Sequence, residues 1–206
     1  LNPMTPGPGA LLCYDELITI GLQRAKSARE AITIMTDLVT KYGYSSVGES
    51  ISVADSHEAW VLEILSRGKW EQGALWVARR VPDGHVTAHA NQARIGKFPR
   101  NDPNNYMFSP DIDTFVTKYG LYSGKPEDLS YCDIVNPMSF SGARSCEARV
   151  WSFFRRVVGN STMDQYIDFV MGHNLTHRFD WSYPVMQGSK LSLSLSLIHI
   201  SQGIVR

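Results

Sequence analysis

The chain has 206 residues, of which 43% are hydrophobic and 19% are charged, a balance typical of a globular protein and not of a disordered one. Twenty basic residues balance twenty acidic ones, which gives no support for binding to nucleic acid or to an anionic membrane. No apolar run reaches about 18 residues, so the sequence predicts no membrane-spanning helix.

Two helices are predicted near the start, after a loop over residues 1–14 that is rich in proline and glycine. The first runs from Asp15 to Gln23. The second begins after Ser27, where SARE forms a capping box in which Ser27 and Glu30 accept hydrogen bonds from backbone amides. Apolar residues then recur at helical spacing before Gly43, and they predict a helix face buried in the core: Ala31, Ile32, Met35, Leu38, Val39 and Tyr42.

The hydrophobic period then changes to two, which predicts four strands over residues 50–55, 59–65, 74–81 and 85–92. The turns between them are short, so neighbouring strands are expected to pair antiparallel as a β-meander. Because the third strand is apolar almost throughout, we expect both faces of the sheet to be covered.

Three helices are predicted in the second half. The first is capped by Ser109, with Pro110 at its first position, and ends before Gly120. The second covers residues 143–157 and the third 162–171. The inward-facing residues of the second are expected to be Cys146, Val150, Phe153, Phe154 and Val157. Helices on a meander predict an α+β fold, a sheet covered by helices.

Residues 186–206 differ from the rest of the chain, because Leu alternates with Ser from Leu191 to Leu197. This pattern fits either an edge strand or a low-complexity, non-native extension, and we expect the latter. Since the chain also begins with Leu1, we expect a fragment: a loop over 1–14, a partial domain over 15–185 and a tail over 186–206. A chain lacking parts of its fold is expected to leave strand residues such as Leu75 and Val77 partly uncovered.

No metal site or cofactor is predicted. His85 and His89 would lie about 13 Å apart along a strand, too far to share one ion. His173 and His177 lack the glutamate of an HExxH site. Two glycosylation sequons, at Asn160 and Asn174, favour a secretory or lysosomal route slightly over the cytoplasm. The location and the oligomeric state are otherwise open.

Four blocks of sequence closely resemble the dipeptidase branch of the dipeptidase–secernin family: YGYSSVGESISVADSHEAWVLEI, GALWVARRVPDGHVTAHANQARI, SPDIDTFVTKYGLYSGK and CEARVWSFFRR. The resemblance covers residues 15–183. It implies an αββα sandwich, incomplete in this chain, of the N-terminal-nucleophile hydrolase type. It also implies a cysteine nucleophile at a mature N-terminus, with the α-amino group of the same residue as base.

The three cysteines form no CxxC pair, and one disulfide or three free thiols are both open: Cys13, Cys132 and Cys146. Cys13 follows a Pro/Gly loop and precedes a helix, whereas the family nucleophile opens a strand. We therefore expect the nucleophile upstream of Leu1, and the chain as written to be inactive.

Three residues are candidates for the site. The resemblance implies that Asn91, at the end of a central strand, binds the developing oxyanion through its amide; the alternative is an Asn that only enters a turn. Arg94 is a candidate for binding a substrate carboxylate, or forms a surface salt bridge. Arg149 resembles in position an arginine that acylases of the wider superfamily place near the nucleophile, where a cation favours the thiolate; the alternative is that it pairs with Glu147 or Asp133.

The function that the resemblance implies is a cysteine dipeptidase acting on dipeptides or short peptides. Two alternatives remain: a secernin-like protein without proteolytic activity, and an acylase that cleaves other amides such as penicillin V or conjugated bile acids. The block HVTAHANQARI favours the dipeptidase branch.

Overall fold

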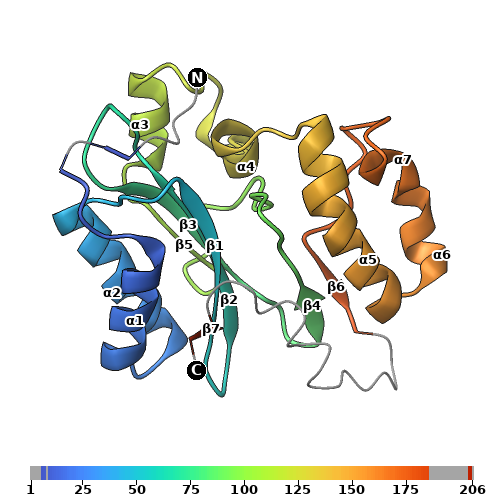
Figure 1. The fold of residues 1–206 in the computed structure, drawn as a ribbon, viewed down its shortest axis with the longest axis horizontal. Helices are drawn as coiled ribbons and strands as arrows, with labels where there is room; N and C mark the ends of the chain where they lie inside the picture. The colour runs from blue at the N-terminus through green and yellow to red at the C-terminus, as the bar shows by residue number, and fades with distance from the viewer. Residues whose placement is uncertain (1–5, 8, 186–203, 206) are drawn as a thin grey trace. The chain divides into compact units, whose positions relative to one another are not determined.

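The computed structural model describes residues 6–7, 9–185 and 204–205, and the chain divides into two compact units (Figure 1). Unit 1 comprises Leu1–Arg80, Ile95–Val135 and Gln202–Arg206, and unit 2 comprises Val81–Arg94 and Asn136–Ser201. Helices and antiparallel sheets occur in both, so the fold is α+β as predicted. The Leu–Ser segment lies outside the described residues. No helix in the described part of the chain combines the length and hydrophobicity needed to cross a membrane.

The two predicted N-terminal helices are confirmed as α1 (Tyr14–Arg24) and α2 (Ala28–Tyr42). At the start of α2, the Ser27 hydroxyl accepts from the Glu30 amide at 3.2 Å. The Glu30 carboxylate accepts from the amide of Lys26 at 2.7 Å, one residue earlier than a capping box places it. Gly43 ends α2 at φ 74°, a left-handed conformation that glycine adopts without a steric penalty.

Unit 1 contains a five-stranded sheet in the order β5-β3-β2-β1-β7. Its members are β1 (Gly48–Ala54), β2 (Ala59–Ser66), β3 (Ala74–Arg80), β5 (Tyr106–Phe108) and β7 (Ile204–Val205). β1, β2 and β3 pair antiparallel, which confirms the first three strands of the meander. β7 pairs parallel with β1.

The prediction that residues 85–92 form the fourth strand of the meander is wrong. β3 pairs with β5 instead. The extended part of residues 85–92 is only β4 (His85–Thr87), which pairs with β6 (Ser182–Pro184) in a two-stranded sheet of unit 2. Alternation shows that a segment has one buried face, but it does not identify the strand's partner.

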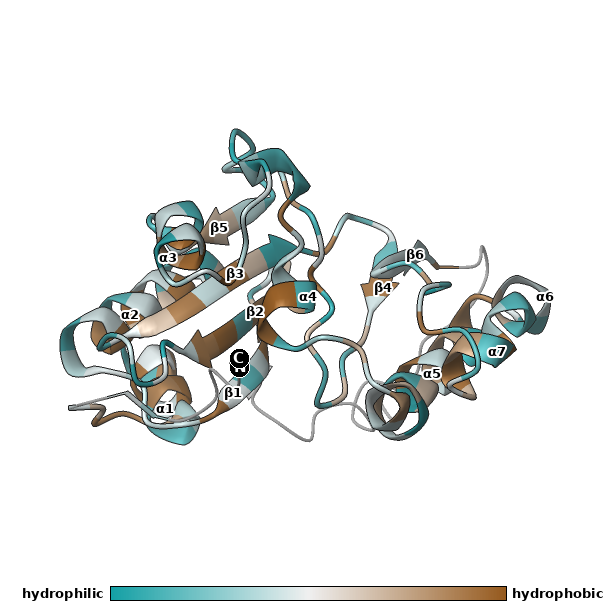
Figure 2. Cartoon of the chain, turned by 90° about the horizontal axis from the view of Figure 1, so that it is seen from above, coloured by the Kyte–Doolittle hydropathy of each residue, from teal (hydrophilic) through white to brown (hydrophobic). Residues whose placement is uncertain are grey.

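The core of unit 1 forms where α2 packs on the sheet. Trp60, Leu62 and Ile64 alternate along β2 and face the apolar stripe of α2, which includes Ile32 and Met35. In Figure 2, much of β2 has the brown colour of hydrophobic residues. This layer contains most of the large, fully buried side chains of the unit, so it anchors the sheet.

The opposite face of the sheet is also covered, as predicted. Leu75 is 3% exposed and Val77 is fully buried, so the expectation that they would be partly uncovered is wrong. The hydroxyl of Tyr131, from α4 (Tyr131–Val135), donates to the carbonyl oxygens of Leu75 at 3.0 Å and Glu63 at 3.2 Å. α4 therefore closes this face.

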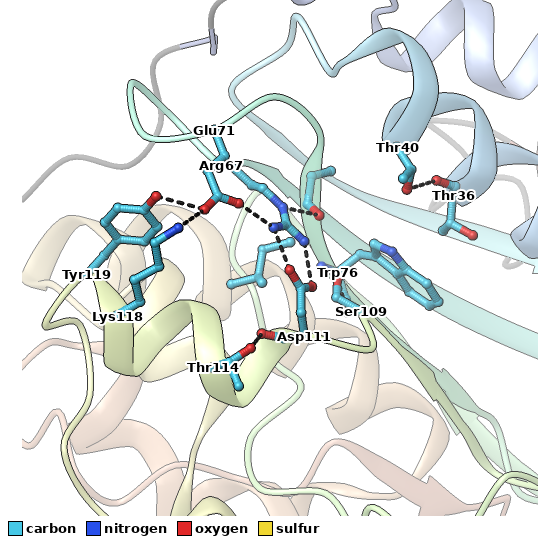
Figure 3. A network of polar contacts seen from close by, with 12 residues as sticks. Thr36, Thr40, Arg67, Glu71, Trp76, Ser109, Asp111, Thr114, Lys118 and Tyr119 are labelled. Atoms are coloured by element: carbon cyan, nitrogen blue, oxygen red, sulfur yellow. Dashed lines mark hydrogen bonds and ion pairs between the residues drawn. The ribbon is translucent and has the colours of Figure 1, made fainter.

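A network of charged groups joins the β2–β3 turn to α3 (Ile112–Lys118) (Figure 3). Arg67 makes a two-pronged contact with Asp111, at 2.6 and 2.7 Å, and a third bond to Glu71 at 3.0 Å. Lys118 and Tyr119 also donate to Glu71, at 2.6 and 2.7 Å. These donors, of which Lys118 has the largest effect, lower the pKa of Glu71 to about 2.

Ser109 does not cap α3 as predicted, because Asp111 occupies the N-cap position. The buried Ser109 hydroxyl instead accepts from the amide of Trp76 at 2.9 Å. It therefore completes the hydrogen bonding of β3 beside the end of β5.

Unit 2 is built on α5 (Ala148–Val157), which follows a π-helical turn over Gly142–Glu147. The helix predicted over 162–171 is three short pieces: α6 (Asn160–Met163), a 3₁₀ turn over Asp164–Tyr166 and α7 (Ile167–Val170). A second 3₁₀ turn, Pro126–Asp128, belongs to unit 1. The core of unit 2 includes the predicted stripe Val150, Phe153, Phe154 and Val157, packed with Phe169 and Phe179.

Candidate active site

The candidate site lies in unit 2, in the loop over residues 88–94 that follows β4. Asn91 is exposed and has φ 57°, the one positive φ of a non-glycine residue in the described part of the chain. Asparagine tolerates this left-handed conformation better than most residues. The prediction that Asn91 ends a central strand is therefore wrong, because the strand stops at Thr87 and the chain turns sharply at Asn91.

Arg149, in the first turn of α5, binds this loop directly. Its Nη2 donates to Oδ1 of Asn91 at 2.9 Å and to the carbonyl oxygen of Ala90 at 3.2 Å. Its Nε donates to the carbonyl oxygen of Ser145 at 2.7 Å. A cation on Oδ1 fixes which end of the Asn91 amide is the acceptor, so the NH₂ end projects elsewhere as a donor.

Arg94 lies inside unit 2 and not on its surface. Its Nε bonds to Oε2 of Glu147 at 3.1 Å, and both side chains are 4% exposed. Its Nη atoms donate to the carbonyl oxygens of Ala88, Trp181 and Asp180 at 3.1, 3.2 and 2.9 Å. These contacts occupy the guanidinium donors that a substrate carboxylate would need. They favour a salt bridge, but a buried one and not the expected surface one. They also show that Glu147 pairs with Arg94 and not with Arg149.

The π-helical turn approaches the same loop at two further points. A Cβ on Gly142 would lie 2.6 Å from Oε1 of Gln92, so a larger residue at this position would require the Gln92 side chain to shift. The Cys146 thiol donates to the carbonyl oxygen of Asn91 at 3.7 Å. Cys146 was predicted to face inward, yet it is partly exposed, and Glu147 is the buried side chain at 3%. The extra residue of a π turn rotates the helix face by one position.

Cys13, the other partly exposed thiol, is held in a form that opposes nucleophilic attack. It sits at the N-cap of α1, where its thiol donates to the carboxylates of Asp15 and Glu16. These contacts raise the pKa of the thiol, and the hydrogen bond to Asp15 contributes most. A nucleophilic cysteine instead needs a lowered pKa. Cys132 is buried in α4.

Two cavities of unit 1, with volumes of about 530 and 540 Å³, share Lys97 in their lining. Neither is lined by Asn91, Arg94 or Arg149. Sequence reasoning missed the contact of Glu147 with Arg94 and that of Gln92 with Asn136. No local pattern marks them, because both contacts join distant segments.

The chain is similar to known proteins. Residues 3–175 match the family model described as peptidase family C69. A probable dipeptidase of Latilactobacillus sakei is 40% identical over 116 residues, which are 56% of this chain and 23% of that protein. A probable dipeptidase of Salmonella dublin is 36% identical over 140 residues, 67% of this chain and 30% of the relative.

A more distant relative aligns over more of the chain. Dipeptidase A of Lactobacillus helveticus is 26% identical over 178 residues, 84% of this chain and 35% of the relative. The chain thus spans between about a quarter and about a third of the length of these three proteins.

Proposed function

Because this chain belongs to peptidase family C69, we propose that it is part of a cysteine dipeptidase, an N-terminal-nucleophile hydrolase that cleaves dipeptides or short peptides. The names of its relatives support this activity. The proposal includes the αββα sandwich as the fold of the full-length protein. The observation that supports the sandwich is a sheet in which β1, β2, β3 and β5 pair antiparallel and both faces are covered.

The proposed role of Asn91 is to stabilise the oxyanion. A thiolate that attacks the peptide carbonyl forms a C–S bond and moves the carbonyl electron pair onto oxygen. The NH₂ of Asn91 then donates to this oxygen without changing its own protonation. When the intermediate collapses, the C–N bond breaks, the amine leaves with a proton, and water hydrolyses the thioester.

The observation that carries the proposal is the hydrogen bond from Arg149 to Oδ1 of Asn91, at 2.9 Å. An unconstrained asparagine presents either its oxygen or its NH₂ to a ligand. With Oδ1 committed to a guanidinium, the side chain is preorganised as a donor, which is what an oxyanion site requires. The positive charge of Arg149 also adds to the favourable potential for a thiolate.

The nucleophile is proposed to lie outside residues 1–206. The chemistry needs a thiol and a free α-amino group on the same residue. Cys13, Cys132 and Cys146 all stand inside the chain, with their amino groups in peptide bonds. Cys13 also has a raised pKa, and Cys132 is buried.

The test is a substrate comparison with the full-length protein. We expect hydrolysis of dipeptides with free termini and little hydrolysis of penicillin V or conjugated bile acids. The reverse preference would make the protein an acylase. Turnover of neither class by folded protein would favour the secernin-like alternative.

A further inference from the structure

A buried ion pair connects the two segments that carry Asn91 and Arg149. Arg94 belongs to the loop of Asn91, and Glu147 is two residues before Arg149. Their side chains meet at 3.1 Å and are 4% exposed, whereas Asn91 and Arg149 are exposed. Two side-chain contacts therefore join the loop to the start of α5: the buried ion pair and the hydrogen bond between Arg149 and Asn91 at the surface.

The buried ion pair contacts more than one segment of the chain. The Arg94 guanidinium donates to Ala88 at the start of the loop, and to Asp180 and Trp181 just before β6. The rings of Phe154 and Phe179 lie 5.6 and 4.9 Å from it. A planar fork with five donors makes all these contacts in one orientation, which a lysine cannot do.

Stability alone is a weak reason for this pair. Burying two charges costs desolvation energy, and an apolar pair of similar volume often serves the fold as well. The pair is also incomplete, because Oε1 of Glu147 is buried with no hydrogen-bond partner among the described residues. What the pair does supply is geometry, since it sets the ends of the loop in which Asn91 adopts its left-handed conformation.

We infer that Arg94 and Glu147 form a positioning pair that holds the loop over residues 88–94 so that Asn91 presents its amide to the oxyanion. The inference rests on the proposed function and deepens it. Arg94 then acts through Asn91 and does not bind the substrate carboxylate.

The first test needs no activity. In the full-length protein, Glu147→Gln keeps the size of the side chain and removes its charge. We expect amide hydrogen exchange of residues 88–94 to rise about tenfold relative to the rest of unit 2. Asp164→Asn is the matched control, because it weakens the ion pair between Arg155 of α5 and the 3₁₀ turn at Asp164 without touching the loop. Equal exchange in the loop of both variants would overturn the inference.

The second test is a double-mutant cycle on dipeptide hydrolysis. Glu147→Gln should lower kcat about tenfold with KM within about twofold, because a small misplacement of a catalytic group costs rate and not affinity. In an Asn91→Gly background the same change should cost less than about twofold. Equal losses in both backgrounds would show a general structural effect and would overturn the inference.

A second variant covers the case in which Glu147→Gln does not fold. Arg94→Lys keeps the opposite charges together but cannot reach the three carbonyl groups at once, and it should give the same exchange and kcat pattern. Wild-type kinetics for folded Arg94→Lys would overturn the inference. If the wild-type protein hydrolyses no dipeptide, the proposed function fails, and hydrogen exchange alone decides whether the pair holds the loop.

Discussion

The guanidinium of Arg149 donates to Oδ1 of Asn91 at 2.9 Å, across 58 residues of sequence. Both residues are exposed, so their contact is not part of a packed core. Because a surface contact between a charged and a neutral side chain contributes little to stability, its value lies in orienting the amide.

Replacing Arg149 should impair catalysis without unfolding the protein. In the full-length protein, Arg149→Met removes the bond to Asn91 and should lower kcat by roughly 10–100-fold, because the amide is then free to turn its oxygen toward the oxyanion. The measurement is kcat and KM for a dipeptide. Arg156→Met, an exposed change on the same helix, is the control and should leave both constants unchanged. Matching kinetics for the two variants would rule out the orienting role.

Cys13 should be dispensable for turnover. Its thiol donates to Asp15 and Glu16, and the resulting rise in pKa leaves little thiolate at neutral pH. Cys13→Ser should retain dipeptide hydrolysis within about twofold of wild type, since it changes no group of the proposed site. A loss of thiol-dependent turnover in Cys13→Ser alone would instead make Cys13 the nucleophile.

Glu71 should make the protein sensitive to acid. The pKa of Glu71 in the folded protein is about 2, below its ordinary value of 4.5. The ionised carboxylate therefore stabilises the folded state fully at pH values above about 4.5. The contribution is lost as the pH falls from about 4.5 to about 2. Glu71→Gln should reduce the free energy of unfolding at pH 7 by on the order of 1 kcal/mol, after allowance for solvent screening.

The measurement for Glu71 is urea unfolding of wild type and Glu71→Gln between pH 7 and pH 2.5. The difference between the two proteins should shrink on acidification, because protonated Glu71 resembles glutamine. A difference that does not depend on pH would show that charge at Glu71 is not the cause.

Ser109 should be needed for the stability of the sheet. Ser109→Ala leaves the buried amide of Trp76 without the acceptor that now lies at 2.9 Å, and an unpaired buried amide costs about 1–3 kcal/mol. Urea unfolding measures this cost, with Ser123→Ala at an exposed position as the control. Equal midpoints for the two variants would contradict the assignment.

Local signals in the sequence predicted the elements that depend on neighbouring residues. The stripe of α2 and its end at Gly43 follow from helical spacing and glycine geometry, and the short turns between β1, β2 and β3 leave only antiparallel pairing. Pairing between distant segments was not predictable. His85 of β4 bonds to Ser182 of β6, 97 residues away, and a period of two is the same whichever partner a strand takes.

The catalytic roles of the candidate residues stay predictions, and only part of their geometry followed from the sequence. The sequence and its family resemblance pointed to Asn91 and Arg149, but not to their contact. A regular helix over residues 143–157 would turn Cys146 inward, whereas the π turn turns Glu147 inward and so creates its pair with Arg94. An inserted residue in a helix has no simple sequence signal, and the partner of Arg94 was therefore missed.

The most direct test of the proposed activity is the turnover number of full-length Asn91→Ala and Asn91→Gly proteins on a dipeptide. Ala removes the amide but strains the left-handed backbone, and Gly removes it without strain. We predict that both lower kcat by roughly 10²–10³, as the loss of one oxyanion donor does, with the Gly variant as stable as wild type. Turnover by folded Asn91→Gly within a few-fold of wild type would contradict the assignment of Asn91 as the oxyanion donor.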